Sequence, residues 1–174
     1  HLRGIELSKH KSNTERRNKL EATLHNILKS VSNKAEEVVC IIERIRLFSG
    51  KQSFININYI KSIGALEALI VDVCSEYNVP VYSVDTRCWK SQVVGTSKPE
   101  SNKYGVEDKK WPTVKWCIRN GWENDILIEI TGRKRKGTFV RNSKRYMYDN
   151  DAADSAAIAT FGFVGDPEKL KKET

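Results

Sequence analysis

The sequence predicts a single α/β domain in which a sheet is flanked by helices, and three features indicate this fold class. A continuous apolar run from Val38 to Ile42 is typical of a central strand that is buried on both sides. A long helix and a second short strand, Val79 to Val84, follow it, and this βαβ order implies two parallel strands. Alternating apolar residues between Ile126 and Thr131 then predict a β-hairpin added to the α/β frame.

The remaining elements follow from the spacing of apolar residues. The polar segment from Asp85 to Gly105 carries no clear pattern, and the charged residues from Glu168 to Thr174 predict a frayed tail. The strand around the first apolar run is expected to span Glu37 to Phe48. We expect helices from Thr14, as the N-terminal cap, to about Val31, from Asn56 or Asn58 to about Tyr77, from Lys109 to Asn120, and from Asp151 to about Phe163.

The composition indicates a basic protein of ordinary hydropathy. Its 174 residues suffice for one domain, 1–174, and no apolar run approaches the ~20 residues of a membrane span. Lys and Arg outnumber Asp and Glu by 30 to 22, which favours an anionic partner such as nucleic acid. The four cysteines form no CxxC pair, and no secretory signal opens the sequence, so we expect no zinc site and a cytoplasmic location.

Two carboxylates near the end of the chain are the most informative feature. Asp151 and Asp154 stand three residues apart, directly before small and apolar residues at helical spacing. On a helix both would lie on one face of the first turn, where they repel each other unless a cation lies between them. A divalent metal ion satisfies this need, and the alternative interpretation is a helix N-terminal cap.

A third carboxylate, Glu43, ends the apolar run of the predicted buried strand. A carboxylate at the end of such a strand needs a partner, either an arginine or a metal ion. Arg44 and Arg46 are close in sequence, so a salt bridge is the alternative to a functional role.

The predicted hairpin is strongly basic. Seven Lys and Arg residues and no acid lie between Thr131 and Tyr148. A solvated loop is one interpretation, but the interleaved Phe139, Tyr146 and Tyr148 favour nucleic acid, because phosphates bind the charges and bases or sugars contact the rings. The residues expected to bind DNA are Arg133, Lys134, Arg135, Lys136, Arg141, Lys144 and Arg145.

These features together resemble the RuvC-type Holliday-junction resolvases. Glu43 at a strand end and, much later, Asp151-Ala152-Ala153-Asp154 at a helix start match the family's order of acids, and Trp89-Lys90-Ser91-Gln92-Val93-Val94-Gly95 resembles its segment leading to Val-Val-Gly. The order of elements also matches over most of the chain. The resemblance implies an RNase H-like mixed sheet flanked by helices, in which the basic β-hairpin, 122–149, is an addition.

The resemblance further implies the activity. It predicts a metal-dependent, structure-selective DNA endonuclease, of phage or bacterial type, that resolves four-way junctions in recombination and repair by phosphodiester hydrolysis with Mg²⁺ or Mn²⁺. Glu43, Asp151 and Asp154 match three of the family's four metal-binding acids. Lys90 matches one of its active-site lysines, and Lys103, with Lys98 as the competing residue, matches another.

The family's fourth acid has no match in this sequence. It lies on the family's first strand, whereas the segment from His1 to Leu7 resembles a later piece, and Glu6 stands in a context that does not fit. We expect either a preceding strand that carries the acid or a catalytically defective nucleic-acid-binding module of the same fold. A relaxed nuclease acting on forks and flaps is a further alternative.

Two structural expectations follow. The carboxyl groups of Glu43, Asp151 and Asp154 should lie within about 8 Å of one another, as a shared metal site requires. A four-way junction presents two symmetry-related strands, so we expect a homodimer. Its interface would be the small-residue face of the second helix, formed by Ile60, Gly64, Ala65, Ala68 and Leu69, and the alternative is that these residues pack on the sheet.

Replacing the four residues Arg133 to Lys136 with Ser should weaken DNA binding and flatten its salt dependence. The reason is that each lost phosphate contact lowers the slope of log K against log salt by about 0.9 on duplex DNA. Fluorescence anisotropy titrations at several salt concentrations measure both quantities. An unchanged affinity and slope would indicate that the segment contacts a protein partner or covers an edge of the sheet.

Overall fold

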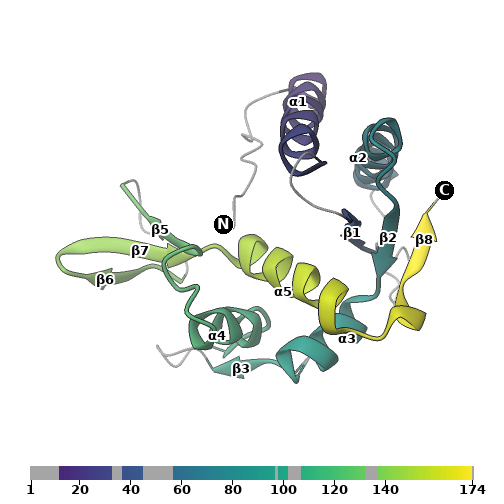
Figure 1. Cartoon of the computed structure of the whole chain (residues 1–174). Helices are drawn as coiled ribbons and strands as arrows, with labels where there is room; N and C mark the ends of the chain where they lie inside the picture. Colours follow the sequence, from purple (N-terminus) through teal and green to yellow (C-terminus); the bar gives the residue numbers. More distant parts are fainter. Residues whose placement is uncertain are drawn as a thin grey trace. The chain divides into compact units, whose positions relative to one another are not determined.

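The computed structural model describes residues 12–32, 37–44, 57–96, 98–101, 107–131 and 137–173 of the chain. These residues form two compact units (Figure 1). The first unit comprises the described parts of Ile5–Asp85 and Leu170–Thr174, and the second lies within Thr86–Lys169. The expectation of one domain, 1–174, stays a prediction.

The first unit combines two long helices with a three-stranded sheet. The strands follow the order β1-β2-β8, with β1 parallel to β2 and β8 antiparallel to β2. Cys40 lies opposite Val81 and Glu43 opposite Val84, which confirms the parallel pair that the βαβ order predicts. The elements are α1 (Asn13–Ser32), β1 (Cys40–Glu43), α2 (Ile57–Glu76), β2 (Val81–Val84) and β8 (Lys171–Glu173).

The core of the first unit lies where α1 and α2 pack on each other and on the strands. Leu20 and Leu28 of α1 meet Leu69 and Val73 of α2, and all four are buried. Burying side chains of this kind contributes about 1.5–3 kcal/mol each, so the helical spacing of apolar residues is sufficient to place both helices. β1 is only half-buried rather than fully buried, because among the described strands it pairs on one side only.

The start of α1 and the C-terminal segment of the chain both differ from expectation. Ser12, not Thr14, caps α1: the N–H of Glu15 donates to Ser12 Oγ, and the N–H of Ser12 donates to Glu15 Oε2, which is a capping box. The C-terminal segment is not a frayed tail, since residues Lys171–Glu173 form β8. Ser83 Oγ donates to Glu173 Oε1 at 2.5 Å, and this bond together with the strand pairing fixes the segment.

The second unit places two helices beside a three-stranded antiparallel sheet, and Figure 1 shows α4 next to the N-terminal part of α5. Its core contains Val114 and Cys117 of α4, Ala153 and Ala156 of α5, and Tyr148 of the sheet. The elements are α3 (Thr86–Trp89), η1 (Lys90–Val94), β3 (Glu100–Ser101), β4 (Glu107–Asp108), α4 (Trp111–Arg119), β5 (Leu127–Glu129), β6 (Phe139–Arg141), β7 (Lys144–Tyr148), α5 (Asn150–Val164) and η2 (Pro167–Lys169).

The boundaries of α4 and α5 agree with the sequence. Gly121 follows α4 with a φ of +80°, a conformation in which glycine is favoured. The polar segment from Asp85 to Gly105, however, contains the helical turns α3 and η1. Trp89 at their junction is fully buried, so one large apolar side chain anchors a segment whose other residues show no periodic pattern.

The added hairpin has a different strand order from the one predicted. The sheet order is β5-β7-β6, so β5 and β6 do not pair with each other, and both flank β7. The hairpin turn lies at Asn142 and Ser143, both with positive φ, as the two-residue turns that match strand twist require. The basic segment Arg133–Lys136 lies outside the described residues, on the connection from β5 to β6.

The small-residue face of α2 is exposed in part. Gly64, Ala65 and Ala68 are exposed and therefore do not pack on the sheet, whereas Leu69 is buried in the core and does not extend that face. Homodimer formation stays a prediction. Among the described helices, none combines the length and apolar character that crossing a bilayer requires.

Gly165 and Gly64 provide a matched pair of Gly→Ala variants. A Cβ at Gly165 would lie 2.5 Å from the ring and the carbonyl oxygen of the buried Phe161, so G165A should destabilise the fold by about 1–3 kcal/mol. A Cβ at Gly64 meets nothing within 4 Å in the middle of α2, so G64A should stabilise it by roughly 0.5–1 kcal/mol. Thermal and urea unfolding measure both changes. A G165A variant as stable as wild type would contradict this packing.

Candidate functional site

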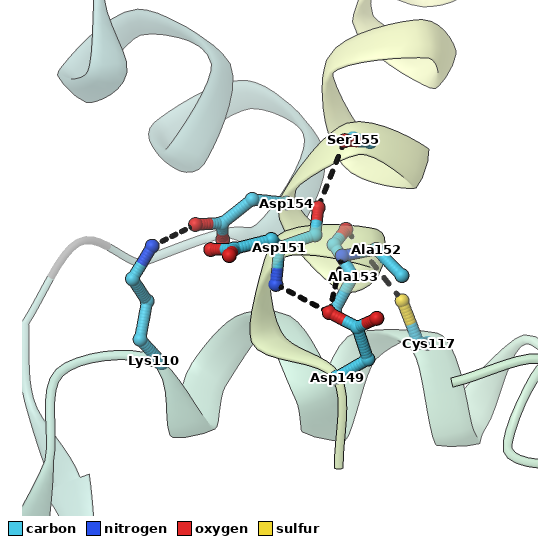
Figure 2. Close-up of polar contacts among 8 residues, drawn as sticks. All are labelled: Lys110, Cys117, Asp149, Asp151, Ala152, Ala153, Asp154 and Ser155. Atoms are coloured by element: carbon cyan, nitrogen blue, oxygen red, sulfur yellow. Dashed lines mark hydrogen bonds and ion pairs between the residues drawn. The ribbon is translucent and has the colours of Figure 1, made fainter. Parts of the chain in front are cut away.

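The first turn of α5 has a dedicated cap. Asp149 has an extended backbone, and its Oδ1 accepts hydrogen bonds from the N–H groups of Asp151 and Ala152, both at 3.0 Å (Figure 2). Asp149 is therefore the N-terminal cap of α5, the role that the alternative interpretation assigned to Asp151 or Asp154. Neither of these two carboxylates is needed to cap the helix.

Asp151 and Asp154 lie on one side of α5, the side of Lys110 (Figure 2). Their spacing makes them neighbours on the helix surface, with Cβ atoms about 5–6 Å apart. Asp151 is exposed, whereas Asp154 is only 6% exposed. The site thus combines one carboxylate that solvent and ligands reach freely with one that is held in the protein interior.

Asp154 is bound on one oxygen only. Lys110 Nζ donates to Asp154 Oδ2 and forms an ion pair with it. The other oxygen, Oδ1, is buried and has no hydrogen-bond partner among the residues that the structure describes. An unsatisfied buried acceptor costs about 1–3 kcal/mol, so this oxygen favours a further cationic or donor ligand.

The donor atoms fit a hard divalent cation. Mg²⁺ and Mn²⁺ prefer carboxylate oxygens, and Mg²⁺ keeps several waters or substrate oxygens in its shell. Asp154 Oδ1 and the exposed Asp151 carboxylate provide such oxygens on one helix face. Across the described ranges, no group of three or more His, Cys, Asp or Glu side chains is arranged to hold a metal ion. The α5 pair therefore provides two carboxylates that suit such a cation, and not a complete set of ligands among the described residues.

The third predicted acid belongs to the first unit. Glu43 is exposed and is the last residue of β1, which is shorter than the predicted strand and stops at the end of the apolar run. Its neighbour Arg44 donates through Nε to Ser83 Oγ at 3.2 Å, and Arg46 lies outside the described residues. The expected approach of Glu43 to Asp151 and Asp154 stays a prediction.

Lys90 is the first residue of the π-helical segment η1. Its Nζ lies 5.1 Å from the centroid of the buried Trp89 ring, and η1 packs against α5. The backbone N–H of Asp166 donates to Gln92 Oε1 at 2.9 Å, which links η1 to the residues after α5. Short π-helical turns occur frequently at functional sites, and this one carries the lysine that the sequence singled out.

Lys110 is the residue that sequence reasoning missed. The second lysine was assigned to Lys103, which lies outside the described residues, or to Lys98, which is exposed. Lys110 directly precedes α4, where the helix dipole disfavours a positive charge. This local conflict is a signal in the sequence, and the buried carboxylate of Asp154 explains it.

Cys117 contributes no ligand. Its Sγ donates to the carbonyl oxygen of Ala153 at 3.8 Å, at the contact between α4 and α5. Burial, followed by the negative charge of Asp154, raises the pKa of this thiol to about 12. The raised pKa fits a buried structural thiol at this helix contact.

The described basic residues of the hairpin differ in their partners. Lys144 Nζ lies 3.0 Å from Glu129 Oε2, and this carboxylate raises the pKa of the ammonium. Arg141 lies 3.9 Å from Glu123. Arg145 is exposed and forms no ion pair with any residue that the structure describes.

Lys110→Met should destabilise the protein more than Lys115→Met. The Lys110 variant leaves Asp154 buried without a partner, which costs about 1–3 kcal/mol, whereas Lys115 pairs with a more exposed carboxylate, Glu100, at 2.8 Å and should contribute less than about 1 kcal/mol. Urea unfolding in EDTA measures both. A K110M/D154N double variant should recover stability, and equal losses in the two single variants would contradict this assignment.

Comparisons with models of known protein families and with curated proteins find no match. Two solved structures of RuvC from Thermus thermophilus, one of them in complex with a Holliday junction substrate, resemble the chain with a TM-score of 0.51. Each is 15% identical in sequence, and the match covers 97% of this chain and 79% of that chain. At this identity the likeness concerns the fold: the chain has a RuvC-like, RNase H-like α/β fold, as the sequence predicts.

Proposed function

We propose that this protein is a metal-dependent, structure-selective DNA endonuclease that cuts four-way junctions by phosphodiester hydrolysis. The observation that carries the proposal is the carboxylate pair of Asp151 and Asp154 on a helix of a RuvC-like fold, with one buried oxygen that has no partner among the described residues. The junction bound to the similar RuvC structure supports branched DNA as the substrate class.

In this proposal each acid binds metal. Asp154 Oδ1 and the Asp151 carboxylate bind Mg²⁺ or Mn²⁺ from α5, and Glu43 is proposed as a third ligand from the end of β1. When bound, a divalent cation supplies Lewis-acid stabilisation of phosphate charge and lowers the pKa of water. The protein's own contribution is to hold these oxygens in place before the substrate arrives.

The lysines have distinct roles. Lys90 neutralises negative charge on the scissile phosphate. Lys110 is a positioning residue, because its ammonium holds Asp154 Oδ2 and so leaves Oδ1 for the cation. In this proposal Lys110 takes the role that was expected of Lys103, which lies outside the described residues.

The proposed assembly is a homodimer, because two strands of a junction need two active sites. The exposed Gly64, Ala65 and Ala68 of α2 remain the proposed interface. Cleavage of forks and flaps is the alternative activity. The third possibility is a nucleic-acid-binding module of the same fold without activity.

Asp154→Asn should abolish cleavage of a four-way junction in Mg²⁺ and leave junction binding intact or tighter, because one negative charge near the phosphates is lost. Asp72→Asn, which changes an exposed acid on α2, is the matched control and should cleave as wild type. Cleavage is followed on gels with a junction, a fork and a linear duplex. Mn²⁺ binding, measured by calorimetry, should weaken in D154N and not in D72N.

The panel separates the candidate functions. Selective cutting of the junction supports the resolvase, and equal cutting of junction and fork supports the relaxed nuclease. Binding without cutting by the wild type in either metal indicates the module without activity. A D154N variant that still cuts would remove α5 from the active site.

A further inference from the structure

The three-stranded sheet of the second unit has two faces with different properties. Residues directly opposite each other in the register share a face. Tyr148 and Leu127 lie opposite each other, as do Tyr146 and Phe139, and this face packs into the core. The opposite face, here called the outer face, consists of Ile128, Val140, Arg145 and Met147.

The cations on the packed face are neutralised. Lys144 lies 3.0 Å from Glu129, and Arg141 lies 3.9 Å from Glu123, which also accepts a hydrogen bond from Tyr148 Oη at 2.8 Å. A phosphate that approached either cation would also approach a carboxylate. These two basic residues, both predicted to bind DNA, are therefore poor phosphate contacts.

The outer face has the opposite character. Arg145 is exposed beside Val140, its partner in the register, and Val140 is 70% exposed. Ile128, on the other side of β7, is 41% exposed. None of the four outer-face residues is acidic, and Arg145 has no ion pair with a described residue, so one cation stands among exposed apolar side chains.

The shape of the sheet suits a groove of nucleic acid. Figure 1 shows β6 and β7 as a two-stranded ribbon that extends away from α5, and the two-residue turn at Asn142 and Ser143 closes it. The major groove of B-DNA, about 12 Å wide, admits a two-stranded β-ribbon. In such a groove, cations bind phosphates and apolar side chains contact sugars and thymine methyl groups.

We propose that the outer face binds a duplex arm of the DNA substrate, with Arg145 on a backbone phosphate and Val140 and Ile128 in apolar contact with the groove. Arg141 and Lys144 are then structural ion-pair residues. The inference rests on the proposed function for its substrate class and adds to it the face that meets the duplex. The rival occupant is a protein, either a second copy of this chain or another partner, that covers the apolar residues.

Arg145→Gln and Lys144→Gln are the matched variants, since both remove one exposed cation from adjacent positions of β7. Binding of a fluorescein-labelled duplex and of a four-way junction is measured by anisotropy in EDTA over a range of KCl. Arg145→Gln should lower the salt slope by about 0.9 and weaken binding roughly five- to tenfold near 0.1 M salt. Lys144→Gln should leave the slope unchanged and the affinity within about twofold, because its charge is already balanced.

Val140→Ser tests the proposed apolar contact between the outer face and the DNA groove. It should weaken duplex binding without changing the salt slope, and light scattering should give the same mass as wild type. Equal effects of the two Gln variants, or none from Arg145→Gln, would overturn the proposal. A changed mass with unchanged DNA affinity in Val140→Ser would favour the protein partner.

The experiments distinguish a failure of the outer-face proposal from a failure of the proposed nuclease function. A wild type that binds the duplex through Arg145 but cuts nothing would overturn the nuclease and leave this face assigned. A wild type that cuts junctions while Arg145→Gln binds normally would overturn this face alone. A wild type that binds no DNA would overturn both.

Discussion

The ion pair between Lys110 and Asp154 is the constraint on which the second unit depends. A carboxylate that is 6% exposed must be balanced, and the balancing lysine comes from a residue 44 positions earlier in the chain. This pair links the start of α4 to the N-terminal part of α5, where Ala153 and Ala156 let the two helices approach closely. Among the described residues the other oxygen of Asp154 has no hydrogen-bond partner, so the contact that stabilises the unit also leaves one buried acceptor unsatisfied.

The sequence predicted the elements whose signal is local. Apolar residues repeat along α1, α2, α4 and α5, and the burial of residues such as Leu28 and Val73 shows why a helical period is sufficient there. It did not predict β8, because that strand depends on pairing with β2 and on the bond from Ser83 to Glu173, 90 positions away. The order β5-β7-β6 was missed for a related reason. Either the basic connection between β5 and β6 or the two-residue turn at Asn142 and Ser143 could join the two strands of a hairpin, and only the pairing of β7 with both other strands shows that the turn does so.

The acidic residues of the candidate site could be predicted from the sequence, but the residues that bind to them could not. The spacing of Asp151 and Asp154 places them on one helix face whatever the rest of the chain does. Which of three neighbouring aspartates caps the helix is decided by backbone geometry, and the extended conformation of Asp149 decides it. Lys110 could not be chosen over Lys98 or Lys103 from spacing alone, because the choice depends on how α4 packs against α5.

The hairpin shows that the sequence alone does not reveal which basic residues are paired with carboxylates. The sequence between Thr131 and Tyr148 contains no acid, and every cation in it looks equally available. The fold brings Glu123, from before this stretch, to Arg141, and pairs β5 with β7 so that Glu129 reaches Lys144. Strand register therefore sorts the charges into two faces, and a cation attracts a phosphate strongly only on the face where no carboxylate accompanies it.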